Sequence, residues 1–302
     1  MTTITLNLTS IGKKMHKMVE QAIEIIRSHA HNPIPQYKLG YSQDEGDTPD
    51  DFATQGDLEA QEMYRETITT DPELEGVGII GEEGLNIPCT LSDCNAYFTI
   101  DPLDGTKAYE RKQSFGVGTM IALVVDEKVV AAFIGDINTG EIFSWTEGGK
   151  ATRERFGRTT VLEPKLTPLK KQYVVFRDAP HKLAPVFSHL SGDGYPNPLF
   201  KEIEVSSGGG GLMMARAWKG EIGVIALKGN RYETPWDHTP ADGISRALGF
   251  VFLRYELDTG DFVEEEPVLY TKVTHRPGII MLIHRHHLPE LRAWMEDYKK
   301  TR

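Results

Sequence analysis

Two aspartates three residues apart are the residues in this chain best suited to chemistry. They stand at positions 101 and 104 of the segment DPLDGT. Carboxylate and carbonyl oxygens are the ligands that Mg²⁺ prefers, and protein-bound Mg²⁺ often also contacts substrate phosphate. Gly105 lets the backbone approach a ligand closely, and Thr106 adds a hydroxyl at a predicted helix start. The segment is predicted to form a metal and phosphate site, although Asp, Pro and Gly also cluster in ordinary acidic turns.

Two predicted strands would carry acidic residues to this site. Residues 96–100 are β-branched and aromatic, which predicts a strand. Pro102 cannot continue a sheet ladder and is expected to end that strand directly after Asp101. Residues 76–80 predict a second, shorter strand that delivers Glu82. Because a buried carboxylate is costly unless it is paired or bound to metal, convergence of the two strand ends would favour a cation.

Helix starts would supply the remaining groups. Asp57 precedes a helical pattern over 58–64, where it is either a helix cap or the acceptor of a hydrogen bond from a catalytic hydroxyl or water. Pro240 suits the first turn of another helix, which would place Asp237 just before its N-terminus. Four glycines at 208–211 stand between a predicted strand and an apolar helix, which favours close backbone approach to a ligand or strand over a flexible linker.

The first half of the chain contains other predicted elements. Apolar residues recur at helical spacing from Ile11 to Ile26, which predicts an amphipathic helix that packs on one face. Residues 31–51 are rich in Pro, Gly and Asp and predict a mobile loop of a kind that can close over a site. Three β-rich runs between residues 114 and 145 predict an antiparallel meander. A turn and a basic segment, 150–158, follow it.

The second half is predicted to alternate between strands and helices. We therefore expect an N-terminal α+β domain over 1–163, with most metal ligands, and a C-terminal α/β domain over 164–302, with the substrate-specificity loops. The strands are predicted at 172–176, 202–205, 222–227, 251–253 and 279–283, and helices from Pro180 to Leu190 and over 289–299. His284, His286 and His287 are more typical of a basic, solvated turn than of a metal site, because no carboxylate lies at ligand spacing beside them.

Composition limits the class of protein. The 302 residues are 39% hydrophobic and 25% charged, as is usual for a soluble enzyme. We find no apolar run of signal-peptide or membrane-spanning length, so we expect a cytoplasmic protein without membrane contact. Cys89 and Cys94 fit neither a disulfide framework nor a zinc site. A net charge of −11 argues against nucleic-acid binding, and an acidic protein that handles phosphate needs a metal to mediate.

Taken together, these motifs resemble the inositol monophosphatase superfamily of Mg²⁺-dependent, lithium-sensitive phosphomonoesterases. The resemblance rests on Asp57 in DFATQGD, Glu82 in GEEG, the segment DPLDGT, and Asp237 in a WD motif, in the same order and at similar spacing over nearly the whole chain. It implies a layered α-β-α-β-α sandwich of the inositol monophosphatase/fructose-1,6-bisphosphatase type, with the site between an α+β half and an α/β half. It also implies a homodimer.

The resemblance assigns a role to each motif residue. Two or three Mg²⁺ ions would be held by Glu82, Asp101, the carbonyl of Leu103, Asp104 and Asp237. Substrate phosphate would be bound by Asp104, Gly105 and Thr106. Catalysis would rest on Glu82, Thr106 and Asp57, with the last two orienting the attacking water.

The substrate stays open because the chain departs from the family pattern. Gly208 and Gly209, which we expect to contact substrate, belong to a glycine run where the family usually has Gly-Ser-Ala-Ala. Lys228, Arg231 and Glu233 occupy the region where inositol phosphatases place an acidic residue on the ring hydroxyls. We expect a small substrate such as an inositol-phosphate-like, sugar, polyol or amino-alcohol phosphate. The alternatives are a 3′(2′),5′-bisphosphate nucleotidase and a catalytically idle metal- or phosphate-binding protein.

Overall fold

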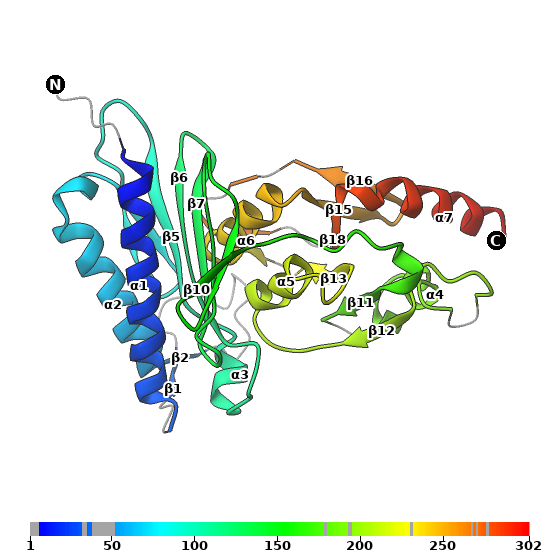
Figure 1. The fold of residues 1–302 in the computed structure, drawn as a ribbon, viewed down its shortest axis with the longest axis horizontal. Helices are drawn as coiled ribbons and strands as arrows, with labels where there is room; N and C mark the ends of the chain where they lie inside the picture. The colour runs from blue at the N-terminus through cyan, green and yellow to red at the C-terminus, as the bar shows by residue number, and fades with distance from the viewer. Residues whose placement is uncertain are drawn as a thin grey trace.

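Five layers of helix and sheet make up the protein (Figure 1). The computed structural model describes residues 6–31, 35–37, 52–177, 180–192, 195–229, 232–266, 268–269, 271–275 and 278–301. Helices α1 and α2 cover one sheet, α5 and α6 lie between the two large sheets, and α4 and α7 lie beyond the second. The predicted α-β-α-β-α architecture is confirmed. In the described parts of the chain, no helix is both long and apolar enough to cross a membrane.

The first layer consists of α1 (Leu8–His29) and α2 (Gln55–Thr70). The apolar face predicted for α1 is buried, with Met15, Val19 and Ile26 fully enclosed against the sheet. Burial of each such side chain contributes about 1.5–3 kcal/mol, so this face anchors the helix. Within the predicted loop 31–51, Pro35–Tyr37 forms strand β1 instead and pairs with β2 (Phe52–Thr54), while 32–34 and 38–51 lie outside the described residues.

The first large sheet has eight strands in the order β10-β9-β8-β7-β6-β5-β3-β4. Its strands are β3 (Gly78–Gly81), β4 (Asn86–Ile87), β5 (Ala96–Asp104), β6 (Gly118–Val125), β7 (Lys128–Asp136), β8 (Ile142–Thr146), β9 (Thr152–Arg155) and β10 (Arg158–Val161). The predicted meander is present as β6, β7 and β8. The basic segment 150–158 also contains a strand, β9, and its last residue starts β10. It was missed because charged side chains on an exposed sheet edge show no apolar alternation.

The second large sheet has six strands in the order β12-β11-β13-β18-β15-β16. The strands are β11 (Tyr173–Phe176), β12 (Glu202–Val205), β13 (Val224–Gly229), β15 (Phe250–Glu256), β16 (Asp261–Glu265) and β18 (Gly278–His284), and β14 (Tyr232–Glu233) pairs with β17 (Thr274–His275) outside it. Strands β11, β12 and β13 run parallel, so their carboxyl ends meet at one edge. The helices are α4 (Pro185–His189), α5 (Gly210–Trp218), α6 (Pro235–Ala247) and α7 (Leu288–Lys300). The helix predicted over 180–190 is broken: a 3₁₀ turn covers Pro180–Lys182, and Pro185 starts α4.

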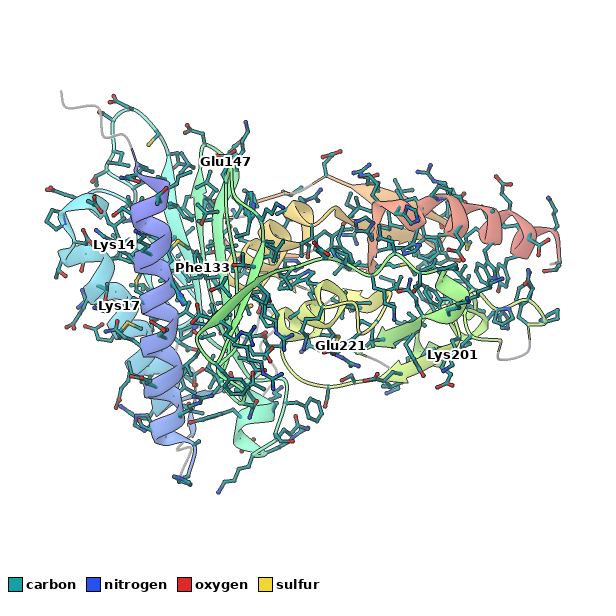
Figure 2. All side chains as sticks on the ribbon, in the orientation of Figure 1. Lys14, Lys17, Phe133, Glu147, Lys201 and Glu221 are labelled. Atoms are coloured by element: carbon teal, nitrogen blue, oxygen red, sulfur yellow. The ribbon has the colours of Figure 1, made fainter. Side chains whose placement is uncertain are left out.

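The middle layer joins the two sheets into one core. Trp218 of α5 is fully buried, and its indole N–H donates to the Ser245 hydroxyl of α6 at 3.0 Å. The same apolar cluster includes Met120 of the first sheet and Ile225 of the second. Figure 2 shows side chains filling the space between the layers. The division at residue 163 falls between β10 and β11, and it remains a prediction because side chains from both halves share this core.

The histidines before α7 are only in part the solvated turn that was predicted, because Arg285 and His286 of this 3₁₀ turn are exposed whereas His284 is half-buried and His287 is buried. His287 is buried, and its Nε2 lies 3.3 Å from the Gln172 amide nitrogen. The Nε2 of His284 lies 3.1 Å from the carbonyl oxygen of Leu248. Burial lowers the pKa of both imidazoles. Sequence reasoning missed this because the enclosing residues come from distant positions in the chain.

Candidate active site

A β-bulge positions the aspartates of the DPLDGT segment. Asp101 pairs with Met120 and Asp104 with Gly118, so one extra residue is inserted in β5. Pro102 does not end the strand, contrary to the prediction. A proline has no N–H to give to the ladder, and a bulge is one of the few places where a strand tolerates it. The bulge keeps both aspartates on the strand and buries both side chains.

Asp237 completes a cluster of three carboxylates. Oxygens of Asp101, Asp104 and Asp237 all lie within 4.8 Å of one another. Helix α6 begins at Pro235, so Asp237 stands in its first turn, and Pro240 lies inside the helix. The helix therefore starts earlier than predicted, because Pro235 occupies its first turn in place of Pro240. The hydroxyl of Thr234 donates to the Asp237 carboxylate.

The glycine run holds the carboxylate of Asp104 at the N-terminus of α5. Its two oxygens accept hydrogen bonds from the N–H groups of Gly210 at 3.0 Å and Gly211 at 2.9 Å. A Cβ at Gly209 would lie 2.4 Å from this carboxylate, so only glycine fits there. The Gly209 N–H donates to the Gly116 carbonyl at 2.8 Å. The predicted close backbone approach is present, and its partners are Asp104 and the loop before β6.

Burial and mutual repulsion raise the pKa values of two carboxyl groups in the acidic cluster. Burial, aided by the negative charge of Asp237, raises the pKa of Asp104 to about 7, while the Gly211 N–H and the charge of Arg177 act in the opposite direction. Burial raises the pKa of Asp101 well above its usual range, and the charge of Glu82 adds to the rise. Buried carboxylates with perturbed pKa values are typical of functional sites.

Asp57 and Thr106 approach the cluster from α2 and α3 (Thr106–Glu110). Asp57 is fully buried, and its carboxylate accepts from the Thr54 N–H at 2.7 Å and the Thr54 hydroxyl at 2.5 Å, which closes a capping box. The Thr106 hydroxyl lies 3.1 Å from the Leu103 carbonyl and 3.5 Å from the other Asp57 oxygen. Asp57 is therefore the third residue of α2, in a capping box whose N-cap is Thr54, and it also lies beside Thr106; its catalytic role stays a prediction.

Glu82 follows β3, as predicted, and is half-buried. Its backbone N–H donates to the Ile100 carbonyl at 3.1 Å, and its side chain is hydrogen-bonded to Asp101. The parallel pairing of β3 with β5 brings these two strand ends together. The predicted convergence of Glu82 with Asp101 is therefore present.

Of the predicted substrate-binding residues, the structure describes the glycines but not the charged side chains. Gly105 is the left-handed residue before α3, and a Cβ there would lie 2.3 Å from the Gly116 carbonyl oxygen. Gly208 is also left-handed and packs against Gly116. Lys228 lies in β13 and Glu233 in β14, but their side chains, and all of Arg231, are outside the described residues.

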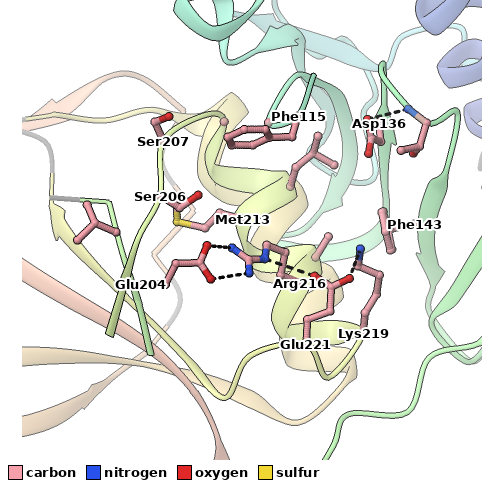
Figure 3. Close-up of a pocket in the computed structure, with 16 residues that line it drawn as sticks. Phe115, Asp136, Phe143, Glu204, Ser206, Ser207, Met213, Arg216, Lys219 and Glu221 are labelled. Carbon is pink, nitrogen blue, oxygen red and sulfur yellow. Dashed lines mark hydrogen bonds and ion pairs between the residues drawn. The ribbon is translucent and has the colours of Figure 1, made fainter. Parts of the chain in front are cut away.

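Sequence reasoning missed several groups around the site. The Gly210 and Gly211 N–H donors could have been anticipated only from their place at a helix start. A pocket of about 530 Å³ adjoins the glycine run and is lined by Phe115, Ser207 and Arg216, among others (Figure 3). A second group of possible metal ligands among the described residues, His16, Glu20 and Glu154, lies between α1 and β9 and does not include any residue of this site.

Comparison with known proteins identifies the family of this chain. Residues 8–288 match the family model described as the inositol monophosphatase family. The chain belongs to the inositol monophosphatase family. Membership of this family supports phosphatase activity. A search of curated protein sequences found no match.

Solved structures of family members share the fold. The Thermotoga maritima IMPase aligns with a TM-score of 0.68 at 16% identity, over 96% of this chain and 98% of its own. An IMPase/NADP phosphatase complexed with Mg²⁺ and phosphate aligns with a TM-score of 0.67 at 15% identity, over 92% of each chain. A staphylococcal inositol monophosphatase-1, in a LiCl-soaked inhibitory complex, aligns at 0.69 and 15% identity, over 93% of this chain and 92% of its own. At these identities the likeness concerns the fold alone.

Proposed function

We propose that the protein is a Mg²⁺-dependent phosphomonoesterase that acts on a small polar phosphate monoester. The observation that carries the proposal is the cluster of two buried carboxylates, Asp101 and Asp104, with half-buried Asp237, beside Glu82. Family membership and the solved relative with Mg²⁺ and phosphate support it. Inhibition by lithium, a homodimer and a cytoplasmic location are further expectations of this proposal.

The acidic cluster fits a divalent cation. Asp101 and Asp104 are buried, and within the described residues neither they nor Asp237 form an ion pair with Lys or Arg. The burial of each uncompensated charge costs several kcal/mol, which a bound cation would offset. Hard oxygen ligands suit Mg²⁺ in particular. We propose that two or three ions are held by Glu82, Asp101, the Leu103 carbonyl, Asp104 and Asp237.

When bound, such ions would neutralise the phosphate dianion and make a nucleophile from water near neutral pH. The chain's own groups would then orient the reactants. The Thr106 hydroxyl and the Asp57 carboxylate, which lie 3.5 Å apart, would hold the attacking water, and Glu82 would accept its proton or hydrogen bond. The N–H groups of Gly105 and Thr106, at the bulge, would bind phosphate oxygens.

The proposal is tested by phosphate release from a panel of sugar, polyol, amino-alcohol, inositol and aryl phosphates, with Mg²⁺ and with EDTA. We expect turnover only with Mg²⁺, and loss of about 100-fold or more in Asp101→Asn, since a metal ligand supplies several kcal/mol to the transition state. The matched control is Asp93→Asn, which makes the same change at an exposed residue. Full turnover in EDTA would overturn the proposal, and Mg²⁺ binding without turnover on any ester would identify an idle binding protein.

A further inference from the structure

Arg177 lies where the carboxyl ends of three parallel strands meet. It follows β11, and its N–H donates to the Ala226 carbonyl of β13 at 3.4 Å. On the other side, the Ser206 N–H, just after β12, donates to the Phe176 carbonyl at 2.9 Å. Ligands of sheets with parallel strands bind at this edge. Arg177 is therefore held between the middle of β13 and the end of β12, at a place suited to a ligand.

The strand's alternation points the Arg177 side chain toward the site. Phe176 packs in the cluster on the α7 face of the sheet, and Val175 packs in the cluster that contains α5 and α6. Successive side chains of a strand point to opposite faces, so Arg177 shares the face of Val175. That face carries α5, whose N-terminal Gly210 and Gly211 hold Asp104. The positive charge of Arg177 accordingly lowers the pKa of Asp104 against the rise caused by burial.

The guanidinium of Arg177 differs from the two cations of the pocket beside the glycine run, Arg216 and Lys219. Arg216, in the adjoining pocket, makes a two-point ion pair with Glu204 and a further one with Glu221, as Figure 3 shows. Lys219 is paired with the same Glu221. Arg177 is exposed and makes no ion pair with any residue in the described part of the chain. It is thus a cation beside the acidic cluster that is available to an external anion.

We infer that Arg177 is a substrate-binding residue that selects phosphate esters carrying a second anionic group, a carboxylate or a second phosphate. The inference rests on the proposed phosphatase function. The ester phosphate is already matched by Thr106, Gly105 and the metal ligands, whereas Arg177 comes from the other half of the chain. A planar guanidinium binds a carboxylate or phosphate through two parallel hydrogen bonds. A neutral polyol substituent offers no such partner.

The test compares matched substrates with the full-length enzyme in Mg²⁺. Glycerol 3-phosphate and 3-phosphoglycerate differ by one carboxylate, and inositol 1-phosphate and inositol 1,4-bisphosphate by one phosphate. We expect the wild-type enzyme to favour the more anionic member of at least one pair by about tenfold or more in kcat/KM, the value of one charged hydrogen bond. The pair that shows the preference identifies which anion is bound.

Variants then test whether Arg177 causes that substrate preference. Arg177→Ala should remove it by lowering kcat/KM for the more anionic member alone, and Arg177→Lys should keep part of it, because the charge remains without the two-point geometry. Arg292→Ala, the same change at an exposed site on α7, should leave it intact. Equal losses on both members, or wild-type activity without any preference, would overturn the inference while leaving the phosphatase in place. Failure to hydrolyse any ester would instead reject the proposed function and the inference with it.

Discussion

Asp57 belongs to the capping box of α2 and, in the proposed mechanism, also acts in catalysis. One carboxylate oxygen takes the hydrogen bonds of Thr54 and so caps α2, while the other faces Thr106. A carboxylate has about four acceptor sites, so the two uses do not compete. The cap holds the side chain in one orientation, which is what a water-positioning group requires.

This division predicts different outcomes for two otherwise matched substitutions. Thr54→Val removes the cap hydroxyl and should lower the stability by about 1 kcal/mol, with a fall in Tm of about 2–4 °C. Thr106→Val removes the hydroxyl on the other side of Asp57 and should lower kcat by about 100-fold, as expected for loss of a group that orients a reacting water. Thermal melts and phosphate release on both variants measure the two effects.

The two variants control for each other because both replace a threonine that contacts Asp57. The assignment is contradicted if Thr106→Val lowers Tm as much as Thr54→Val does and leaves kcat unchanged. In that case the Thr106 hydroxyl would serve only the turn that it closes with the Leu103 carbonyl.

At the scale of elements, the start of α5 is built to receive an acidic side chain. A helix N-terminus offers unpaired N–H groups and a partial positive charge, and Asp104 uses two of those groups. The glycine run lets this end approach β5 and β6 without side chains in the way. A Cβ at Gly211 would lie 2.3 Å from the Met120 sulfur, whereas a Cβ at Gly210 would meet nothing within 4 Å.

Neighbouring glycines should therefore respond in opposite directions to the same change. Gly209→Ala places a methyl group against the Asp104 carboxylate and should weaken Mg²⁺ binding and lower Tm. Gly210→Ala keeps the N–H that bonds Asp104 and should raise stability by about 0.5–1 kcal/mol, because alanine in a helix loses less backbone entropy than glycine. Calorimetric titration with Mg²⁺ and thermal melts would show the contrast. Equal effects of the two substitutions would mean that space at Gly209 is not what the site needs.

At the scale of the whole molecule, the acidic cluster couples stability to pH and to metal. The folded protein holds the proton of Asp104 to about pH 7, well above the range of an unfolded aspartate. Between about pH 4 and about pH 7 the folded state therefore binds more protons than the unfolded state. Stability without metal should fall as pH rises through this window, by at most about 1.4 kcal/mol per pH unit from this group.

A bound cation should reverse this trend, because its ligands must be deprotonated. We expect the rise in Tm caused by Mg²⁺ to grow between about pH 5 and about pH 8. Melts in Mg²⁺ and in EDTA at several pH values provide the measurement. Asp104→Asn carries no titrating group at this position and should weaken the dependence, while Asp101, whose pKa is also raised, keeps part of it. A Mg²⁺ effect that is constant with pH would show that the cluster does not bind the ion through these carboxylates.

Much of the architecture could be predicted because its signals are local. The buried faces of α1 and the meander strands follow helical and alternating apolar periods, and each motif acid lies close to a strand or helix end. Predictions failed where tertiary context overrode a local rule. Pro102 sits in a bulge created by pairing with β6, and His287 is enclosed by residues such as Gln172.

The sequence by itself determined which residues could bind metal and phosphate, because their types, order and spacing are properties of the chain. Only the tertiary structure brought Asp101, Asp104 and Asp237 within 4.8 Å of one another and placed Arg177 on the face that carries α5. Such proximity depends on the pairing register of the strands and on the face of the sheet to which each side chain points. A shift of the register by one residue would move every side chain of a strand to the opposite face. The chemistry was therefore visible in the residues, whereas the second contact for the substrate became visible only after the sheets were assembled.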